Sequence, residues 1–217
     1  NLESMKSRYT QDFIKVIEYD YYHFAEINND VVKNHVSPDT ELLLFSNNDI
    51  ELINDAISEM VSLWSKNKKR CGTVGARLHF EDNTLQHAGM YLFGRREGEN
   101  INLGLTHHGH RSPYTYPFEN VTGTIGNTAA FVLISKDLFM DVGMFNEDYM
   151  ECLEDVELNL ACVVKGKLNC FAGNAVGYHY ESITRKTDGR LNPQDWQKLV
   201  SFIQSNPKLM NVVQILN

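Results

Sequence analysis

The feature that most constrains the fold is a short apolar run, residues 42–45, that ends in Ser46-Asn47-Asn48-Asp49. An apolar run of this length, bounded by polar residues, predicts a strand buried in a sheet. In open α/β sheets, ligands bind beyond the carboxyl ends of the strands, which is where Asn47, Asn48 and Asp49 would lie. Two amides and a carboxylate there suit a divalent cation, but Asn and Asp also favour turns and helix N-caps. The tripeptide alone leaves both interpretations open.

The rest of the chain alternates between strand and helix patterns. Residues 13–19 and 73–80 alternate like half-buried strands, whereas residues 24–36 and 53–64 keep a helical period. This order predicts an α/β domain with a largely parallel sheet and crossover helices. Further on, residues 129–134 and 168–172 are expected to be strands, and residues 136–142 and 156–164 helices. Residues 94–116, rich in Gly, His and Arg, predict an irregular functional loop.

Both ends of the chain also favour helices. Residues 1–9 are expected to form a polar helical end. Near the other end, Asn192-Pro193 and Asn206-Pro207 each place an N-cap residue before a proline at the first helical position. These pairs predict two helix starts.

Composition narrows the class of protein. With 217 residues, 42% of them hydrophobic and 22% charged, the chain is typical of one globular domain. The formal net charge of −8 disfavours a nucleic-acid partner, which a basic face would attract. No apolar run approaches the roughly 20 residues of a membrane-spanning helix, and no signal peptide opens the sequence. The four cysteines lack a CxxC pair, which favours buried reduced thiols and a cytoplasmic location.

Three further groups of residues could carry chemistry. The acidic run at residues 151–157 suits either the positive end of a helix dipole or a general base. His179, after the last strand, is either a structural histidine or, near Asp49, part of a divalent-metal site. His107, His108 and His110 lack further ligands at zinc spacing, so a substrate-contacting or merely solvated loop is favoured over a metal hydrolase.

Taken in order, six segments resemble motifs of the family 2 glycosyltransferases with the GT-A fold. The resemblance covers about residues 10–186. It rests on a paired Asn in residues 24–29, a DXD-type motif in residues 42–49, and a strand plus Gln-His-Ala-Gly of rhamnosyltransferase-like members in residues 74–78 and 85–89. It continues with residues 142–148, similar to Val-Gly-Gly-Phe-Asp-Glu, the Glu-Asp motif in residues 153–158, and the His-containing motif in residues 178–182. Each motif is weak alone, but their order makes the resemblance specific.

The resemblance implies an inverting sugar transfer from a nucleotide-diphosphate sugar to a glycan acceptor, in polysaccharide or surface-glycan synthesis. Asp49, assisted by Asn47 or Asn48, would bind Mn²⁺ or Mg²⁺ on the donor diphosphate, with His179 near the metal. Asp155, next to Glu154, would be the general base. Gln86, His87 and Thr128 would line the acceptor side.

The sequence also departs from the family pattern. Thr128-Ala129 stands where Thr-Gly is usual, Ala161 where Arg is usual, and Glu157 where Asp is usual. The family begins with a strand, a helix and a second strand that hold the nucleoside, and this sequence starts after them. We therefore expect residues 1–188 to form a shortened GT-A-like domain and residues 189–217 a helical tail. This piece alone could then be inactive, and any peripheral membrane contact would run through the absent parts. The alternative is a non-catalytic glycan- or partner-binding module with a degenerate fold.

Overall fold

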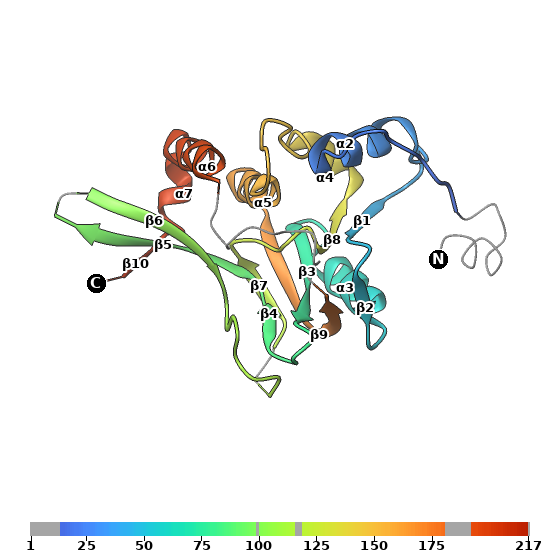
Figure 1. Cartoon of the computed structure of the whole chain (residues 1–217), viewed down its shortest axis with the longest axis horizontal. Coiled ribbons are helices and arrows are strands. Elements are labelled where there is room, and N and C mark those ends of the chain that lie inside the picture. The colour runs from blue at the N-terminus through green and yellow to red at the C-terminus, as the bar shows by residue number, and fades with distance from the viewer. Residues whose placement is uncertain (1–13, 99, 116–118, 181–191, 217) are drawn as a thin grey trace.

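The computed structural model describes residues 14–98, 100–115, 119–180 and 192–216. Its centre is a seven-stranded sheet with helices on both faces (Figure 1). The sheet contains β1 (Leu42–Ser46), β2 (Ile50–Leu52), β3 (Cys71–His79), β4 (Leu85–His87), β7 (Val121–Thr124), β8 (Phe131–Ser135) and β9 (Leu168–His179). The strand order is β1-β8-β3-β9-β2, with β4 paired to β3 and β7 paired to β9. The predicted α/β class is confirmed.

The expectation of a mostly parallel sheet is wrong, because the sheet is mixed. Among its described strands, β3 and β9 run parallel, whereas β1–β8, β8–β3 and β9–β2 are antiparallel. Between β3 and β8 the chain adds β4 beside β3 and β7 beside β9, and β8 then enters between β1 and β3, antiparallel to both. The direction of a strand depends on the length and path of the connection that precedes it. The apolar pattern within the strand gives no information on that direction.

Apolar clusters cover both faces of the sheet. Helix α3 (Ala56–Asn67) packs on one face, whereas α2 (Phe24–Asn34), α4 (Lys136–Asp141) and α5 (Glu154–Val164) pack on the other. Strand β1 contributes Leu43 and Phe45 to the second cluster, and its alternate residues pack against the first. Strand β3 is buried along nearly its whole length, not on one face as its alternation predicted. A sheet enclosed between two layers of helices leaves no polar face for its central strands.

The first predicted strand is absent from the described part of its range. Residues 14–19 form no strand in the structure. They lie beside α2 instead, where the Tyr19 hydroxyl donates a hydrogen bond of 2.6 Å to Asp30 Oδ2. Alternation makes a strand only where a sheet edge accepts it. The helical end expected at residues 1–9 lies outside the described residues.

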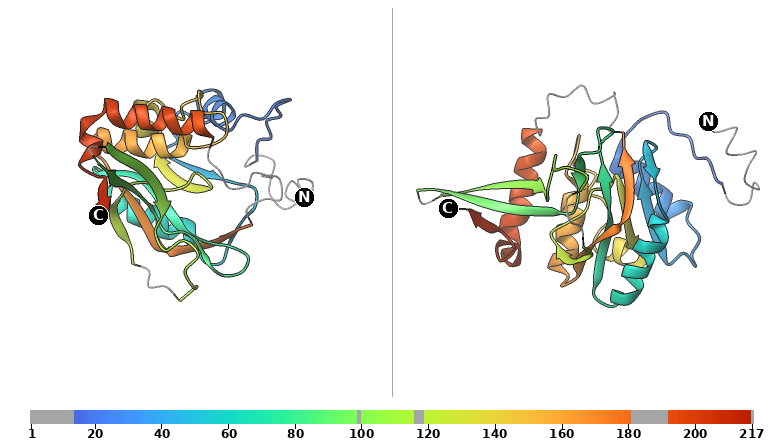
Figure 2. Two further views of the ribbon diagram at one scale, coloured as in Figure 1. Left: turned by 60° about the vertical axis from the view of Figure 1, so that its left-hand side comes forward. Right: turned by 90° about the horizontal axis from the view of Figure 1, so that it is seen from below.

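Residues 94–116 were expected to be an irregular loop, but much of this range belongs to a long β-hairpin, called the arm below. Strands β5 (Met90–Glu97) and β6 (Asn100–His107) pair antiparallel, and β10 (Gln214–Leu216) adds to β5 in parallel. Figures 1 and 2 show the arm extending away from the central sheet. Gly94 and Gly104 interrupt the apolar alternation in the sequence, because Ile101 and Phe93 from the opposite strand occupy the space beside them. These glycines concealed the hairpin.

Helices α6 (Pro193–Ser205) and α7 (Pro207–Met210) begin where the Asn-Pro pairs predicted. Asn192 Oδ1 accepts a hydrogen bond of 2.9 Å from the Gln194 N–H, as an N-cap should. The two helices bury Leu199, Ile203 and Leu209 in a third apolar cluster with residues of α5 and β5. The domain boundary at residue 188 stays a prediction, although this cluster joins residues on both sides of it.

A network of buried polar side chains links α5 to the central sheet. Asn159 of α5 is 1% exposed. Its Oδ1 accepts hydrogen bonds from Thr73 Oγ1 (2.6 Å) and the Asn127 N–H (3.1 Å), and its Nδ2 donates to the Asn127 (2.8 Å) and Asp155 (2.6 Å) carbonyls. Gly126 leaves room for this side chain, since a Cβ there would lie 2.8 Å from Asn159 Cβ. The network ties α5, β3 and the loop before β8 into one unit.

A second buried polar contact lies at the base of the arm. His87 Nε2 accepts a hydrogen bond of 3.2 Å from the Gly89 N–H, so its proton resides on Nδ1, 2.6 Å from Nδ1 of His107. Burial first, and then neighbouring His110 and His108, lower the pKa of His107 to about 4. Burial and His107 likewise hold the pKa of His87 well below its ordinary value. Both rings are therefore neutral at pH 7.

We predict that Asn159→Ala lowers the free energy of unfolding by about 3–5 kcal/mol, because the buried groups that bond to the amide would lose these hydrogen bonds. Urea denaturation measures the change. The matched control is Asn34→Ala, an exposed asparagine at the end of α2 whose amide donates to Asp30 of the same helix. It should change stability by less than about 0.5 kcal/mol. Equal small losses in both variants would contradict the role of the network.

We predict that the chain loses stability as the pH falls from about 6.5 to about 4. In that window the unfolded His107 binds a proton that the folded ring, with its pKa lowered to about 4, rejects. The depression of His107 alone corresponds to about 3 kcal/mol. His107→Gln keeps an acceptor for His87 but cannot bind a proton, so it should make the pH profile of urea midpoints less steep and leave the slope that the buried His87 contributes. His35→Gln, at the end of α2, should leave that profile steep.

Candidate functional site

The pairing of β2 with β9 brings two distant polar residues together. Ile50 lies opposite His179 in this antiparallel pair, and Asp49 immediately precedes Ile50. His179 Nε2 lies 3.2 Å from Asp49 Oδ1, and the two side chains are 12% and 21% exposed. Asn47 Nδ2 also lies 3.2 Å from His179 Nε2. Asn48 is exposed in the turn between β1 and β2. The structure thus groups Asn47, Asp49 and His179, and leaves Asn48 at the rim.

The other nitrogen of His179 contacts β4. Its Nδ1 lies 2.8 Å from Gln86 Oε1, and an amide oxygen can only accept. Nδ1 therefore carries a proton and donates it to Gln86, while Nε2 lies toward Asp49 and Asn47. Asp49 Oδ1 is buried and accepts no hydrogen bond from the described residues, although it lies close to Nε2. A carboxylate oxygen and an imidazole nitrogen that lie this close together are ligand types that a divalent cation can share.

The acidic motif lies at the first turn of α5. Glu154 is the first residue of this helix and Asp155 the second. Asp155 Oδ2 accepts a hydrogen bond of 2.9 Å from the Ala129 N–H, while the next carbonyl, that of Ala130, accepts one of 2.8 Å from the Asn47 N–H. Thr128 Oγ1 accepts from the Ala130 N–H at 3.3 Å. One short loop thus connects the acidic motif to the Asn47-Asp49 turn.

The loop that enters α5 is held by a residue that sequence reasoning missed. Asp195 of α6 is fully buried and accepts hydrogen bonds from the backbone N–H groups of Met150 (3.0 Å), Glu151 (2.9 Å) and Cys152 (3.3 Å). Leu153, the next residue, has a left-handed backbone with φ of 82°. Such a conformation costs on the order of 1 kcal/mol or more and persists where its surroundings impose it. In the sequence, Asp195 looks like an ordinary acidic residue of a first helical turn.

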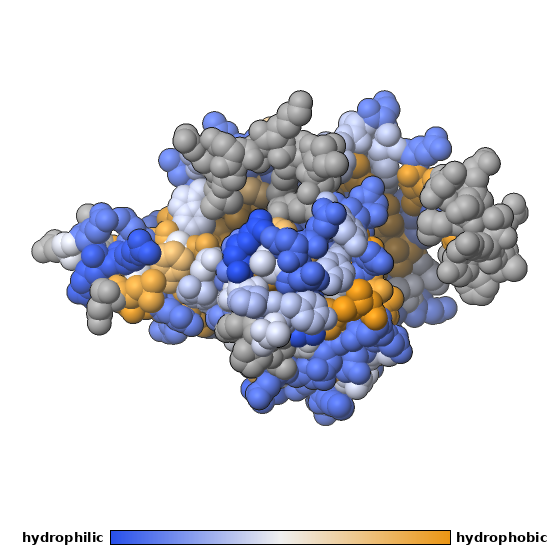
Figure 3. All heavy atoms as spheres, turned by 60° about the horizontal axis from the view of Figure 1, so that its bottom comes forward, coloured by the Kyte–Doolittle hydropathy of each residue, from blue (hydrophilic) through white to orange (hydrophobic). Residues whose placement is uncertain are grey.

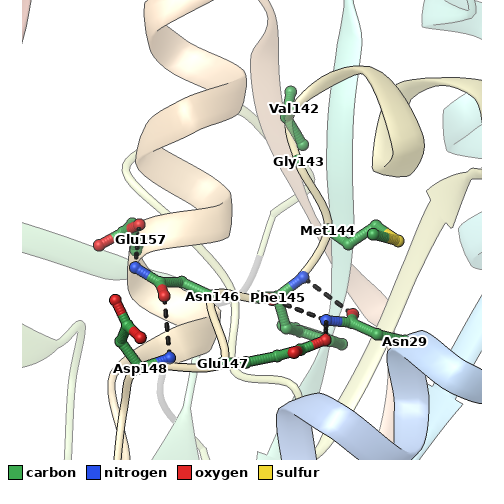
Figure 4. Close-up of a pocket in the computed structure, with 9 residues that line it drawn as sticks. All are labelled: Asn29, Val142, Gly143, Met144, Phe145, Asn146, Glu147, Asp148 and Glu157. Carbon is green, nitrogen blue, oxygen red and sulfur yellow. Dashed lines mark hydrogen bonds between the residues drawn. The ribbon is translucent and has the colours of Figure 1, made fainter.

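Two motifs of the resemblance contact one another beside a pocket of about 380 Å³ (Figure 4). Asn29 Nδ2 donates to the Phe145 carbonyl and to Glu147 Oε1, both at 2.8 Å, and its Oδ1 accepts from the Phe145 N–H at 3.1 Å. The Phe145 ring packs 4.9 Å from that of Phe45 on β1. Through these contacts the paired Asn of α2 holds the Phe-Asn-Glu segment, and Phe145 of that segment packs against β1.

Glu157 lines the same pocket from α5. Its carboxylate accepts hydrogen bonds from Asn146 Nδ2 (2.9 Å) and the Tyr149 hydroxyl (2.6 Å). Burial, and then the hydrogen bond to Glu157, raise the pKa of Tyr149 far above its ordinary value. Glu157 thus holds the loop before α5, and the residues that line this pocket do not include Asn47, Asp49 or His179.

The predicted acceptor-side residues separate in the structure. Gln86 joins the group around His179, and Thr128 lies in the loop beside Asp155. His87, 1% exposed, points instead to His107. Their acceptor role stays a prediction. In the part of the chain that the structure describes, no three His, Cys, Asp or Glu side chains form a group that could hold a metal by themselves.

Comparison with known proteins yields two kinds of similarity. No family model matches the chain. The sequence is 29% identical over 193 residues to the O-antigen biosynthesis protein RfbC of Myxococcus xanthus, a match that covers 83% of this chain and 14% of that protein. It is 30% identical over 176 residues to the uncharacterized protein y4gI of Sinorhizobium fredii (strain NBRC 101917 / NGR234), covering 76% of this chain and 18% of that protein. The chain thus spans less than a fifth of the length of these relatives.

The fold is similar to that of a solved transferase. The crystal structure of GalNAc-T7 with UDP, GalNAc and Mn²⁺ matches with a TM-score of 0.61 and 12% identity, over 93% of this chain and 39% of that one. No helix among the described residues is long and apolar enough to cross a membrane. The sequence matches and the shared GT-A fold together support a family 2-like glycosyltransferase assignment for this chain.

Proposed function

We propose that this chain is the part of an inverting glycosyltransferase that binds the donor diphosphate and deprotonates the acceptor. The observation that carries the proposal is the approach of Asp49 Oδ1 to His179 Nε2 at 3.2 Å, in a half-buried position next to Asn47. The donor is a nucleotide-diphosphate sugar, and the acceptor is a glycan hydroxyl. The similarity to a protein named for O-antigen biosynthesis supports bacterial polysaccharide synthesis as the setting.

The donor set fits Mn²⁺ or Mg²⁺ with a diphosphate. Asp49 Oδ1 is a buried carboxylate oxygen that accepts no hydrogen bond from the described residues, and the imidazole nitrogen Nε2 of His179 lies 3.2 Å from it. Two protein ligands are too few for a closed site, but such ions commonly take one or two protein groups together with phosphate oxygens. When bound, the ion supplies positive charge that stabilises the departing diphosphate. A neighbour of the same fold was solved with UDP and Mn²⁺, which agrees with this pairing.

Asp155 is the proposed general base. Its place in the first turn of α5 favours the ionised carboxylate, and the Ala129 N–H orients one of its oxygens. The carboxylate takes the proton of the acceptor hydroxyl as the oxygen of that hydroxyl bonds to the anomeric carbon. The bond from that carbon to the diphosphate oxygen breaks on the opposite face, and the diphosphate leaves with the electron pair. The anomeric configuration is therefore inverted. Gln86 and Thr128 are proposed to position the acceptor.

We predict that the chain binds Mn²⁺ more tightly with inorganic diphosphate present than without it, because the diphosphate completes the coordination sphere. Water-proton relaxation reports the protein-bound ion. Asp49→Asn and His179→Gln should each weaken this ternary binding at least about tenfold. Asp39→Asn, an exposed turn carboxylate before β1, is the matched control and should bind like wild type. Absence of ternary binding in the wild type would leave the non-catalytic module as the better interpretation.

We predict that Asp155→Asn, in the whole protein that contains this chain, lowers sugar transfer by about 10²–10⁴-fold. Release of nucleoside diphosphate from a panel of UDP-, GDP- and dTDP-sugars measures the turnover. Ternary binding of Mn²⁺ and diphosphate should remain. Asp137→Asn is the matched control, since Asp137 is the second residue of α4 as Asp155 is of α5, and it is exposed. Wild-type turnover in the Asp155 variant would refute the base assignment.

A further inference from the structure

The arm has two unlike faces. Along β5, Met90 and Leu92 are buried and pack with Leu199 and Ile203 of α6, so one face belongs to the third apolar cluster. Because successive side chains of a strand point to opposite faces, Tyr91, Phe93 and Arg95 lie on the other face. Figure 1 places α6 and α7 on one side of the arm, so this second face is directed away from them.

The second face carries a row of rings that ends in a cation, called the aromatic row below. The rings of His108 and Tyr91 lie 4.8 Å apart, and those of Tyr91 and Phe93 lie 5.9 Å apart. The guanidinium of Arg95 lies 5.7 Å from the centre of the Phe93 ring. At the strand rise of about 3.3 Å per residue, the row from Tyr91 to Arg95 extends about 13 Å. Its rings are half-buried and Arg95 is exposed, so their surfaces face solvent.

The residues opposite the row on β6 are small or polar. Thr106 pairs with Tyr91, Gly104 with Phe93, and Asn102 with Arg95. Three atoms of the Phe93 ring lie where a Cβ of Gly104 would be, which means that the ring lies flat across the glycine. A flat ring flanked by hydroxyl, amide and guanidinium groups combines a stacking surface with hydrogen-bonding groups. Figure 3 shows that the arm carries hydrophilic surface toward its end, with hydrophobic surface next to it.

The row is connected to the candidate site. The backbone N–H of His108 donates to the Gly89 carbonyl at 3.0 Å, and His110 Nδ1 lies 3.2 Å from the Gln86 carbonyl oxygen. The side chain of Gln86 in turn contacts His179. In Figure 1, β4 and the carboxyl end of β9 lie at the lower end of the central sheet, away from α6 and α7. A chain-like ligand that leaves the site past β4 would therefore meet the aromatic row.

We propose that the aromatic row is a binding site for the acceptor glycan, remote from the sugar that is extended. The C–H faces of sugar rings stack on Tyr91 and Phe93, and Arg95, Asn102 and Thr106 bind sugar hydroxyls. This inference rests on the proposed function, since it takes the ligand to be that reaction's acceptor. Single-stranded nucleic acid would also suit rings beside an arginine, but the net charge of −8 opposes it.

The test is binding of purified bacterial polysaccharide fragments of two to six sugars, screened on an array and followed by titration calorimetry. Phe93→Leu, which keeps an apolar side chain but loses the ring, should weaken binding at least about fivefold, whereas Phe93→Tyr should retain it. Arg95→Ala should also weaken binding. Arg96→Ala is the matched control, because Arg96 is the adjacent exposed arginine and points to the opposite face of the strand. Thermal melts verify that each variant is folded.

The outcomes separate this inference from the proposed function. Loss of glycan binding in the Phe93 and Arg95 variants with Mn²⁺–diphosphate binding unchanged supports the aromatic row. If the variants lose glycan binding but the wild-type chain does not bind Mn²⁺ and diphosphate, the glycan-binding role of the aromatic row is supported. The proposed transferase function is then contradicted. Equal effects of Arg95→Ala and Arg96→Ala would show that the glycan is held by non-specific attraction to positive charge. That result would contradict the proposed binding site. Failure of every fragment to bind wild type, or binding of a single-stranded oligonucleotide instead, also overturns it.

Discussion

The geometry of the site depends on the hydrogen bonds made by the side-chain amide of Asn159. The amide bonds one turn back to the Asp155 carbonyl and across to the backbone of Asn127, two residues before the Ala129 N–H that holds the Asp155 carboxylate. A buried amide is stable only when its donors and acceptors are paired, so each partner has one permitted position. These hydrogen bonds therefore fix the start of α5 relative to the loop before β8.

A second constraint acts on a different loop, the one that precedes α5. Asp195 collects three backbone N–H groups before the left-handed Leu153, and Glu157 holds Asn146 and Tyr149. Carboxylates that accept hydrogen bonds from backbone N–H groups form charge-assisted contacts, which are stronger than neutral ones. The acidic run of residues 151–157 is thus divided by environment: Asp155 faces the loop before β8, whereas Glu157 supports the loop that precedes the helix.

Much of the local structure was predictable because it depends on nearby residues. The Asn-Pro helix starts follow from capping chemistry. The arm was missed because Gly94 and Gly104 break the alternation, and their reason is a side chain on the opposite strand. In the same way, β1 reads as a central strand, yet it lies at one end of the described order. Its apolar faces are met by helices, and its sequence contains no information on which edge is paired.

The amino-acid sequence by itself determined the α/β class, most helix limits and, through ordered motifs, the grouping of Asp49 and Asp155 with His179 as site candidates. Only the tertiary structure decided which members of those motifs meet. It joined Gln86 to His179 but turned His87 toward His107, and it left Asn48 exposed. The physical reason is that a motif records residue types at a spacing, whereas a contact depends on strand register. The antiparallel register of β2 and β9, which places Ile50 opposite His179, is a property of the folded sheet.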